Sequence, residues 1–591
     1  MKIRKIICDI ETDSLENCKH IWVCSCKEYG TDKVIAFREG DREKAKEYIE
    51  SFDKIIGHNF IEFDSYWLNK LWNINIPISK IEDTLVMSRL ADSSRKSHSL
   101  KFLSQGTEEE KTHHEDWSQW SEEMEEYCKQ DVRATEVVYN NLVKELQDFS
   151  SESIYIEHMS QYILANQRRV GFKLDIDRAL FIKNKIENEY MEILSSLENI
   201  LKPRKILVKE YKVRRKADGD LTLKSKEIIS RPYVEHVEGD LYNIYEYKPF
   251  NIDSPSEIVE RLKDYWDPYE FTKNGQPQVN ENNLNTLKEN APEELKLIKK
   301  CKTLKSRATL IESFIKAMGE DGRVHGSVMS IGTVTHRMAH NNPNTGNIPR
   351  KGLYGAVCRE LFIVDKGRKL VGCDASGIQL RALAHYLNDQ SLIHQIESGD
   401  VHWYLSGVYG LHRPDEAYDE HNPAMKKARD TAKTITYSIL MGGGAAKIGS
   451  IAGGDFNKGK KIFNSLSRRL KTWDKLKRRL AKSADRGYLI SIGGRKIPVK
   501  SAHFGMSVLL QSFEQDIMKW AMIQSYKRLK GIDSYQVAIV HDEFQRDTAE
   551  DQAEYVGKVM RQCIIDAGEH YKVNLKLDGE YKIGNNWGET H

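Results

Sequence analysis

A short apolar stretch close to the end of the chain places the strongest constraint on its fold. Residues 537–540 read Val-Ala-Ile-Val without interruption, which is typical of a strand covered on both faces. The run stops on His541, Asp542 and Glu543, and Phe544 resumes the apolar character. The pattern predicts a tight hairpin with an acidic tip. Carboxylates at the end of a buried strand are costly unless a partner or a cation neutralises them.

A second apolar stretch ends in the same way. Residues 369–374 read Lys-Leu-Val-Gly-Cys-Asp, and Ala375 follows. Two aspartates at strand ends can hold a pair of divalent ions, and two-metal sites serve phosphoryl transfer. We therefore expect Asp374 and Asp542 to form one site.

A helix-like stretch between these two strands carries cations. Arg429, Lys433 and Tyr437 stand at i, i+4 and i+8, so they share one face of a helix. Two cations and an aromatic ring suit a triphosphate tail with a sugar or base beside it. A solvated cationic face with a core tyrosine is the alternative, and an isolated helix would favour it. The aspartates before and after the helix favour the phosphate-binding interpretation.

Its length and composition place the chain among large soluble proteins. Its 591 residues predict several domains, because single cores rarely grow beyond about 250–300 residues. Hydrophobic residues make up 40% and charged residues 30%, and no apolar run of about 18 residues predicts a membrane span. The chain enters a strand-like segment almost at once, so we expect no signal or transit peptide. The expected location is the cytoplasm.

Cysteines and net charge say little, but the distribution of charge is informative. The nine cysteines are scattered and complete no zinc set, so ordinary reduced thiols are expected. A net charge of +3 is nearly neutral. Basic residues gather at 202–231 and 458–486, and local basic patches suit a polyanionic partner.

The first 150 residues alternate between strand-like and helix-like segments, which predicts an α/β domain around a mixed sheet. The expected strands are Lys5–Ile10, Ile21–Glu28, Lys33–Arg38 and Lys54–Gly57, and the expected helices are Trp67–Trp72, Thr84–Leu90 and Glu122–Glu145.

Three acidic fragments lie within this region. Asp9 and Glu11 end the first expected strand two residues apart, so they lie on the same face of an extended chain. Asp64 comes later, in His-Asn-Phe-Ile-Glu-Phe-Asp. Tyr127 and Asp131 stand at i and i+4, on one face of a helix. A solvated acidic face explains most carboxylates on a helix, so each fragment is weak by itself.

In this order and spacing the fragments resemble the three motifs of the DEDDy 3′–5′ exonucleases, which have an RNase H-like fold. The resemblance implies that Asp9, Glu11, Asp64 and Asp131 hold two Mg²⁺ ions and that Tyr127 orients the attacking water. Phosphodiester hydrolysis needs both an activated water and neutralised charge on the leaving oxygen. A degenerate, inactive domain is the alternative, but none of the five positions is lost.

The remaining residues resemble the polymerase region of family A DNA polymerases, the group of bacterial DNA polymerase I. Motif A is Asp374-Ala-Ser-Gly-Ile-Gln-Leu-Arg, motif B spans residues 429–442, and motif C is His-Asp-Glu at 541–543. The branch most similar to this chain is that of the replicative polymerases of short-tailed bacteriophages. The resemblance implies a multidomain α/β protein, in which an RNase H-like exonuclease domain precedes a right-hand polymerase domain.

The expected domain boundaries follow from the motifs. The exonuclease domain is expected at 1–150 and the polymerase domain at 151–591, divided into a thumb at about 151–320 with a basic insertion at about 202–248, a palm at about 321–400 and 490–591, and fingers at about 401–489. A solvated loop is one interpretation of the insertion. A surface for DNA or for a processivity partner is the other.

The resemblance also implies roles around the nucleotide. Asp374 and Asp542 would ligate both metals, and the Ala375 carbonyl would complete the nucleotide-side ion. Mg²⁺ is the expected ion in both active sites, with Mn²⁺ as a substitute. The triphosphate would contact Arg429 through its γ-phosphate, His402 through its β-phosphate, and Lys433, which would protonate the pyrophosphate. Tyr437 would lie against the sugar and base.

Further roles concern the primer and template. Arg337 and Gln511 resemble residues that read minor-groove acceptors common to all correct base pairs. His541 would lie near the primer terminus, and Glu543 would be an auxiliary acid. The implied function is template-directed addition of deoxynucleotides to a primer 3′ end, with 3′–5′ proofreading. The expected partners are primer-template DNA, deoxynucleotides and a processivity factor or helicase of unknown identity.

Three positions depart from the family pattern. Gln379 stands where a glutamate usually excludes the ribose 2′-hydroxyl, so we expect DNA synthesis with somewhat weaker sugar discrimination. Met441 replaces a tyrosine that usually closes the template side. Ser507 replaces an asparagine that usually accompanies Gln511, which predicts reduced minor-groove checking.

Three rival functions remain open at this point. The chain could be a stand-alone exonuclease with a non-catalytic DNA-binding half, but that predicts damaged ligands in motif A or C, and both are intact. It could copy RNA templates, or it could be a structural replication scaffold. The related phage enzymes use a thumb insertion to bind a host thioredoxin. The corresponding segment here is shorter and differs in sequence, so that partner is not predicted.

Overall fold

The computed structural model describes residues 3–413 and 416–591. The chain divides into two compact units. One consists of Met1–Leu174, Ala317–Ile348 and Arg359–His591, and the other of Asp175–Lys316 with Pro349–Cys358. The predicted multidomain α/β class is confirmed. None of the helices in the described residues combines the length and apolar character that a membrane crossing requires.

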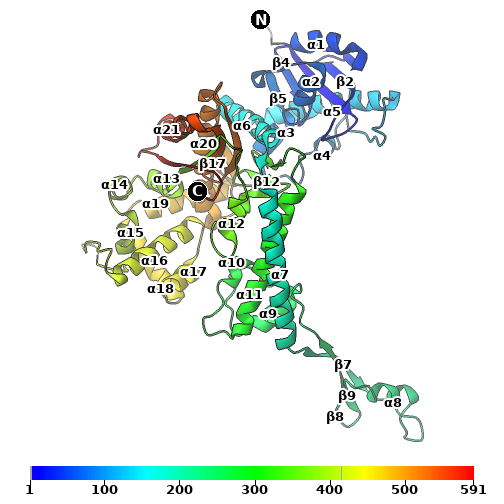
Figure 1. The fold of residues 1–591 in the computed structure, drawn as a ribbon, viewed down its shortest axis with the longest axis vertical. Helices are drawn as coiled ribbons and strands as arrows, with labels where there is room; N and C mark the ends of the chain where they lie inside the picture. Colours follow the sequence, from blue (N-terminus) through cyan, green and yellow to red (C-terminus); the bar gives the residue numbers. More distant parts are fainter. Residues whose placement is uncertain (1–2, 414–415) are drawn as a thin grey trace. The chain divides into compact units, whose positions relative to one another are not determined.

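The N-terminal part of the first unit contains a five-stranded mixed sheet, drawn in blue in Figure 1. The central strand β1 (Lys5–Thr12) pairs antiparallel with β2 (Ile21–Glu28) and parallel with β4 (Lys54–Gly57). The outer strands are β3 (Val34–Arg38) beside β2 and β5 (Ile81–Asp83) beside β4. The predicted mixed sheet is confirmed, with strand boundaries within two residues of the expected ones.

Successive side chains of β1 point to opposite faces of this sheet, and each face packs against a different core. Ile6 and Cys8 belong to the core on one side of the sheet, whereas Ile7 packs with Val132 of α5 (Glu122–Glu145) on the other. Since side chains two apart share a face, Asp9 lies on the side of Ile7 and α5. The other helices here are α1 (Arg42–Glu50), α2 (Asp64–Trp72), α3 (Thr84–Ala91) and α4 (Leu100–Ser104).

A four-stranded antiparallel sheet forms the centre of the C-terminal part. Its order is β16-β17-β13-β18, and its strands are β13 (Arg368–Ala375), β16 (Ser534–Val540), β17 (Glu543–Ala549) and β18 (Gly579–Gly584). β16 and β17 form the predicted hairpin, which turns at His541 with a φ of 57°. This left-handed conformation is uncommon for a residue with a side chain and is tolerated here at a two-residue turn.

Helices pack against this sheet and build the largest core of the chain. α20 (Ala502–Arg528) contributes Phe513 and Ile517, which lie in one cluster with Leu383 of α13 (Ile378–Leu387). The same cluster extends to the segment predicted as fingers. The helices that share it are α6 (Ser151–Val170), α14 (Gln390–Ser398), α15 (Val401–Tyr409), α16 (Pro423–Leu440), α17 (Ala445–Ile451), α18 (Phe456–Arg469), α19 (Trp473–Arg486) and α21 (Ala553–His570).

Small elements complete the first unit. They are β6 (Phe172–Lys173), β10 (Arg323–Val324), β11 (Ser327–Met329), β12 (Ala339–Asn341), β14 (Tyr488–Ile490), β15 (Lys496–Pro498) and the 3₁₀ turns Glu39–Asp41, Ile78–Lys80, Thr345–Asn347 and Glu550–Gln552.

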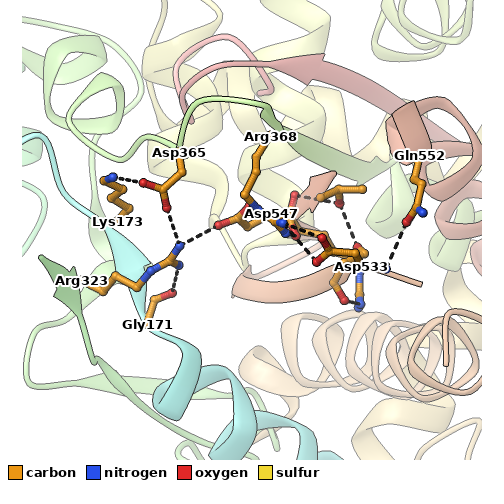
Figure 2. Close-up of polar contacts among 11 residues, drawn as sticks. Gly171, Lys173, Arg323, Asp365, Arg368, Asp533, Asp547 and Gln552 are labelled. Carbon is orange, nitrogen blue, oxygen red and sulfur yellow. Dashed lines mark hydrogen bonds and ion pairs between the residues drawn. The ribbon is translucent and has the colours of Figure 1, made fainter. Parts of the chain in front are cut away.

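A buried aspartate joins the four-stranded sheet to the two-stranded sheet of β6 and β10 (Figure 2). Asp547, on β17, is 2% exposed. Its carboxylate accepts hydrogen bonds from Nη2 of Arg323 at 3.0 Å and from Nε of Arg368. Arg323 also reaches Asp365, and Arg368 reaches Asp533. A buried carboxylate needs such partners. These ion pairs link β13, which carries Asp374, to β17, which begins directly after Asp542.

The second unit is built on two long helices, α7 (Ile176–Ile200) and α11 (Glu293–Lys316), with α9 (Pro255–Leu262) beside them. Ser254 caps α9 by accepting a hydrogen bond from the Glu257 amide. Leu197, Ile258 and Ile298 belong to its core. The short helix α10 (Glu281–Leu284) also belongs to this unit. A further short helix, α12 (Gly355–Glu360), begins in this unit and ends at the start of the next segment of the first unit.

The basic insertion is folded, so the solvated-loop interpretation is wrong. It forms a three-stranded sheet in the order β7-β9-β8, with β7 (Arg204–Lys212), β8 (Val234–Glu238), β9 (Leu241–Lys248) and the short helix α8 (Leu223–Ile229). Leu207, Val208 and Leu223 are exposed large hydrophobic residues of this segment. The side chains of these strands are exposed or only partly buried, so no alternation of apolar and polar residues reveals the sheet in advance.

Candidate active sites

The two strand-end aspartates lie together. The amide of Ala375, directly after Asp374, donates to the carbonyl oxygen of Asp542 at 2.9 Å, and Asp374 is the register partner of Glu543. Burial raises the pKa of Asp542 well above its usual value, and the charge of Asp374 raises it further. Two neighbouring carboxylates repel each other, and a bound cation would neutralise that repulsion. Oxygen ligands suit a hard divalent ion such as Mg²⁺. The residues present therefore fit a metal site.

The cationic helix faces this pair. Arg429, Lys433 and Tyr437 all lie on α16, as predicted. Lys433 is exposed, and Tyr437 is 39% exposed. Burial raises the pKa of Tyr437, and the charges of Asp542 and Asp374 raise it further, which places this ring beside the aspartates. The stripe thus runs from the acidic pair outward along α16, as a triphosphate-binding surface requires.

An aspartate that the sequence reasoning missed holds Arg429. Asp400 caps α15, where its Oδ1 accepts from the amides of His402 and Trp403 at 3.1 and 3.0 Å. Its Oδ2 accepts from Nε of Arg429 at 2.6 Å. An Asp directly before an apolar helix is a recognisable N-cap signal, but nothing in the sequence indicates that the same carboxylate reaches α16.

His402 lies beside the stripe. Its ring centroid is 6.3 Å from that of Tyr437. Burial lowers the pKa of His402, and the charges of Lys433 and Arg429 lower it further. The imidazole is therefore neutral near neutral pH.

Another buried acid contacts two of the residues predicted to bind the substrates. Glu514 of α20 is 1% exposed, and its carboxylate accepts from Nη2 of Arg337 at 2.8 and 3.0 Å. It also accepts from Nε2 of Gln379 at 2.8 Å. The structure thus brings together two residues predicted to contact the substrates, and it joins them through a third that the sequence reasoning did not select.

The other predicted contacts lie near this cluster. Gln511 is one turn before Glu514 on α20, and its Nε2 is 4.0 Å from the sulfur of Met441. Met441 itself is half exposed. Ser507 is buried and donates to the Phe504 carbonyl, so its hydroxyl is used within α20.

Glu543 is held by the end of the chain. Its Oε1 accepts from the indole Nε1 of Trp587 at 2.6 Å and from Gln545. Its Oε2 pairs with His591 and with Arg359. A carboxylate with four such partners is committed to structure, which disfavours the predicted role as a freely acting auxiliary acid.

The exonuclease carboxylates gather where β1 meets α5. Carboxylate oxygens of Asp9 and Glu11 and the sulfur of Cys128 lie within 4.8 Å of one another, so the same-face prediction is confirmed. Asp64, the first residue of α2, accepts from the amide of Ile10 at 3.0 Å. Asp131 lies on α5, one turn after Tyr127.

Burial and mutual repulsion raise the pKa values of these carboxyl groups. Burial raises the pKa of Asp9 to about 7, and the charge of Asp131 adds to that effect. Burial likewise raises the pKa values of Glu11 and Asp64, each also raised by the charge of Asp9. Burial also raises the pKa of Tyr127 to about 12. A cluster of carboxylates that resist ionisation fits a divalent-cation site, and its all-oxygen donors fit Mg²⁺.

A lysine also enters this cluster. Lys111 pairs with Asp131, and its Nζ lies 4.5 Å from the centroid of the Tyr127 ring. The sequence reasoning did not select it. No local motif marks it, because the segment around it is irregular.

A cavity of about 700 Å³ opens beside the cluster. Its lining includes Asp9 and Asp131 together with cationic side chains that suit a phosphate backbone, namely Arg89, Lys101, Lys111 and Arg168. Such an arrangement can bind a single-stranded nucleic-acid end with its terminal phosphodiester at the carboxylates.

With both sites described, two family models match the chain. One, "DNA polymerase family A", matches residues 222–589. The chain belongs to DNA polymerase family A. The other, "3'-5' exonuclease", matches residues 2–147, so this family A polymerase carries an exonuclease domain ahead of its polymerase region.

Two phage DNA polymerases align with this family A polymerase over nearly its whole length. It is 27% identical over 718 residues to the DNA-directed DNA polymerase of Enterobacteria phage T3, covering 99% of this chain and 100% of that protein. It is 26% identical over 725 residues to that of Escherichia phage T7, with the same coverage. The predicted relationship to phage polymerases is confirmed.

A solved structure shares the fold. The polymerase domain of Pol1 from M. smegmatis, in complex with DNA primer-template and dNTP, has a TM-score of 0.78 and 16% sequence identity. The match covers 100% of this chain and 96% of that one. The fold prediction is therefore confirmed, while the residue roles and exact domain boundaries stay predictions.

Proposed function

We propose that this polymerase adds deoxynucleotides to a primer 3′ end under the direction of a DNA template, and that its exonuclease domain removes mispaired nucleotides from that end. The observation that carries the proposal is the pairing of Asp374 with Asp542 through the 2.9 Å backbone hydrogen bond of Ala375, beside the cationic face of α16. Primer-template DNA and deoxynucleotides are the proposed substrates, as named for the related M. smegmatis complex.

Family A polymerase and exonuclease domains generally use divalent metals. We propose Mg²⁺, with Mn²⁺ as a substitute. Asp374, Asp542 and the Ala375 carbonyl would hold it at the polymerase site, and Asp9, Glu11, Asp64 and Asp131 at the exonuclease site. When bound, two such ions favour the deprotonated nucleophile and neutralise charge on the leaving oxygen.

In synthesis, the primer 3′-hydroxyl loses its proton to solvent, its oxygen attacks the α-phosphorus, and the bond to the bridging oxygen of pyrophosphate breaks. Arg429 binds the γ-phosphate and His402 the β-phosphate. Lys433, exposed on the same helix face, neutralises the leaving pyrophosphate and gives it a proton. Tyr437 lies against the sugar and base of the incoming nucleotide. His541, at the tip of the β16–β17 hairpin, contacts the primer terminus.

In proofreading, a water molecule attacks the last phosphodiester and loses a proton to solvent, and the 3′ oxygen of the preceding nucleotide leaves and takes up a proton from solvent. The hydroxyl of Tyr127 orients that water. Because burial keeps the pKa of Tyr127 at about 12, this hydroxyl stays protonated and acts as a hydrogen-bond donor. The cationic lining of the neighbouring cavity holds the single-stranded end.

Reciprocal substitutions test both activities on one labelled primer-template. Asp542→Asn should abolish primer extension and leave 3′ trimming intact. Asp64→Asn should abolish trimming and leave extension intact. Extension that survives Asp542→Asn, or trimming that survives Asp64→Asn, would contradict the assignment of that site. A wild-type protein that trims but never extends would favour a stand-alone exonuclease.

We further propose that the insertion, residues 202–248, binds a processivity factor or helicase. Its folded sheet exposes Leu207, Val208 and Leu223 among many lysines and arginines, which suits a partner with an acidic surface around an apolar centre. Replacing residues 205–247 with a short turn should leave extension of short templates unchanged and shorten the products made per binding event in a host extract. The cytoplasmic location stays a prediction.

A further inference from the structure

The carboxylate of Glu514 stands between two side chains that were assigned to different substrates. Its Oε2 accepts both from Nη2 of Arg337 at 3.0 Å and from Nε2 of Gln379 at 2.8 Å. Its Oε1 accepts from the same Arg337 nitrogen at 2.8 Å. The three residues come from the loop before β12, from α13 and from α20, so this single acid joins three parts of the polymerase region.

The hydrogen bond to Glu514 fixes which end of the Gln379 amide faces the rest of the site. A carboxylate only accepts hydrogen bonds, so Gln379 must turn its NH₂ group toward Glu514. The carbonyl oxygen of Gln379 is then the atom left for other partners. Without Glu514, the amide could turn over and could also leave its present position.

The ion pair constrains Arg337 in a similar way. Both contacts to Glu514 use Nη2, and Nε of Arg337 is buried without a hydrogen-bond partner. A buried donor without a partner costs free energy. The two contacts of Nη2 with Glu514 are thus the side-chain hydrogen bonds that keep the guanidinium in place.

We propose that Glu514 is a positioning residue for nucleotide selection: it holds Gln379 as the barrier beside the sugar of the incoming nucleotide and holds Arg337 as the donor to the primer terminus. The proposal rests on the proposed polymerase function and on the roles that the family resemblance implies for Gln379 and Arg337. Glu514 itself touches neither substrate in this scheme.

The location of Glu514 supports this role over a purely structural one. It is one turn from Gln511 on the same helix, and its charge reaches both His541 and Asp542 of the hairpin tip. The partner Gln379 comes from α13, the helix that follows Asp374, so the contact links this acid directly to the nucleotide site.

The test measures single-nucleotide incorporation and compares kcat/KM for a deoxynucleotide with that for the matching ribonucleotide. In Glu514→Gln, Gln379 and Arg337 lose their charged acceptor, and hydrogen bonds to charged groups contribute enough for about a tenfold effect. Discrimination against the ribonucleotide should fall about tenfold, through a gain in ribonucleotide kcat/KM and a rise in deoxynucleotide KM.

An exchange of the two groups separates positioning from folding. Gln379→Glu places a second carboxylate beside Glu514 and should also impair incorporation. The double variant Gln379→Glu/Glu514→Gln restores one carboxylate and one amide in contact, with donor and acceptor reversed. It should recover discrimination to within about threefold of wild type. The proposal would be overturned if the double variant lost as much discrimination as either single variant, or lost the product of the two single losses.

A matched control is Glu257→Gln in the second unit, which removes another buried carboxylate paired with arginines, Arg204 and Arg261. It should leave sugar discrimination unchanged. Unchanged discrimination in Glu514→Gln would overturn the positioning role alone, since the enzyme still polymerises. A wild-type enzyme that incorporates no nucleotide would instead overturn the proposed function and this inference with it.

Discussion

Asp400 Oδ2 accepts a hydrogen bond from Nε of Arg429 across 2.6 Å, while Oδ1 of the same carboxylate caps α15. The contact uses the inner nitrogen of the guanidinium and leaves its outer nitrogens for a phosphate. Arg429 is thus oriented before any nucleotide arrives, which reduces the ordering that binding must supply.

Asp400→Asn tests this preorganisation. Asparagine is as good a cap as aspartate, so α15 should keep its stability, whereas the charge that holds Arg429 is lost. We expect KM for deoxynucleotides to rise about three- to tenfold, with kcat nearly unchanged. Steady-state incorporation at varied nucleotide concentration checks this. A fall in KM would mean that Asp400 competes with the triphosphate for Arg429.

The protonation of His402 has a measurable consequence. Burial and the nearby Lys433 and Arg429 lower its pKa below the usual 6.5. The free enzyme therefore holds His402 neutral above that value, and kcat/KM reports groups of the free enzyme. Replacing His402 with Gln should lower kcat/KM by a constant factor from about pH 6.5 to 8.5. A ratio of variant to wild type that changes with pH in this range would contradict the assignment.

Glu543→Gln should affect stability more than chemistry, since the side chain is bound by Trp587, Gln545 and His591. Burial alone would raise the pKa of Glu543, but the hydrogen bond and charge of His591 and the charge of Arg359 lower it below 4.5. A carboxyl with a lowered pKa contributes stability that is present above the pKa of the unfolded chain and lost as the pH falls through the folded value.

Thermal unfolding between about pH 7 and pH 3 measures this contribution. The wild type should exceed Glu543→Gln in stability at neutral pH, and the difference should shrink below about pH 4.5. Primer extension should fall far less than in Asp542→Asn. Loss of extension equal to that in Asp542→Asn would place Glu543 in the chemical step.

Asp547→Asn should destabilise the four-stranded sheet. The buried carboxylate neutralises Arg323 and Arg368 (Figure 2). Both arginines retain other acidic partners, so we expect a loss of about 2–3 kcal/mol in the free energy of unfolding. The control is Asp533→Asn, which removes a half-exposed partner of Arg368 and should cost less than about 1 kcal/mol. Denaturant titration compares the two.

Lys111→Met should change the metal requirement of the exonuclease site. Burial alone would lower the pKa of Lys111, but the charges of Asp131 and Asp9 raise it, so this ammonium group stays charged among the carboxylates. Without it, their negative charge is uncompensated, and the Mg²⁺ concentration for half-maximal trimming should fall about threefold or more. Lys129→Met, which removes a lysine paired with Glu125 on α5, should leave that concentration unchanged. A higher requirement in Lys111→Met would contradict the prediction.

Features set by local sequence were predictable. The hairpin at His541 and Asp542 followed from an apolar run that stops on charged residues, and the common face of Asp9 and Glu11 followed from the period of a strand. Arg429, Lys433 and Tyr437 share a face because helical spacing requires it. In each case a few neighbouring residues determine the geometry.

Contacts between distant segments were not predictable from one sequence. Asp400 reaches Arg429, Glu514 reaches Gln379, and Lys111 reaches Asp131 only because the fold brings separate elements together. The contacts of Glu543 were equally unpredictable, because its partners Trp587 and His591 lie more than 40 positions further along the chain. Buried polar groups are satisfied by such long-range partners, and no spacing rule identifies them.

The insertion leaves the second unit and returns to it at nearly one point. Arg204 and Lys248 are register partners at the base of β7 and β9, so the two cut ends are neighbours and a short turn can join them. A segment with that geometry can be gained, lost or exchanged for an unrelated domain without breaking the helices on either side. Related polymerases could therefore share a catalytic body and still differ in the accessory proteins they recruit, and a foreign binding module could be grafted at this position.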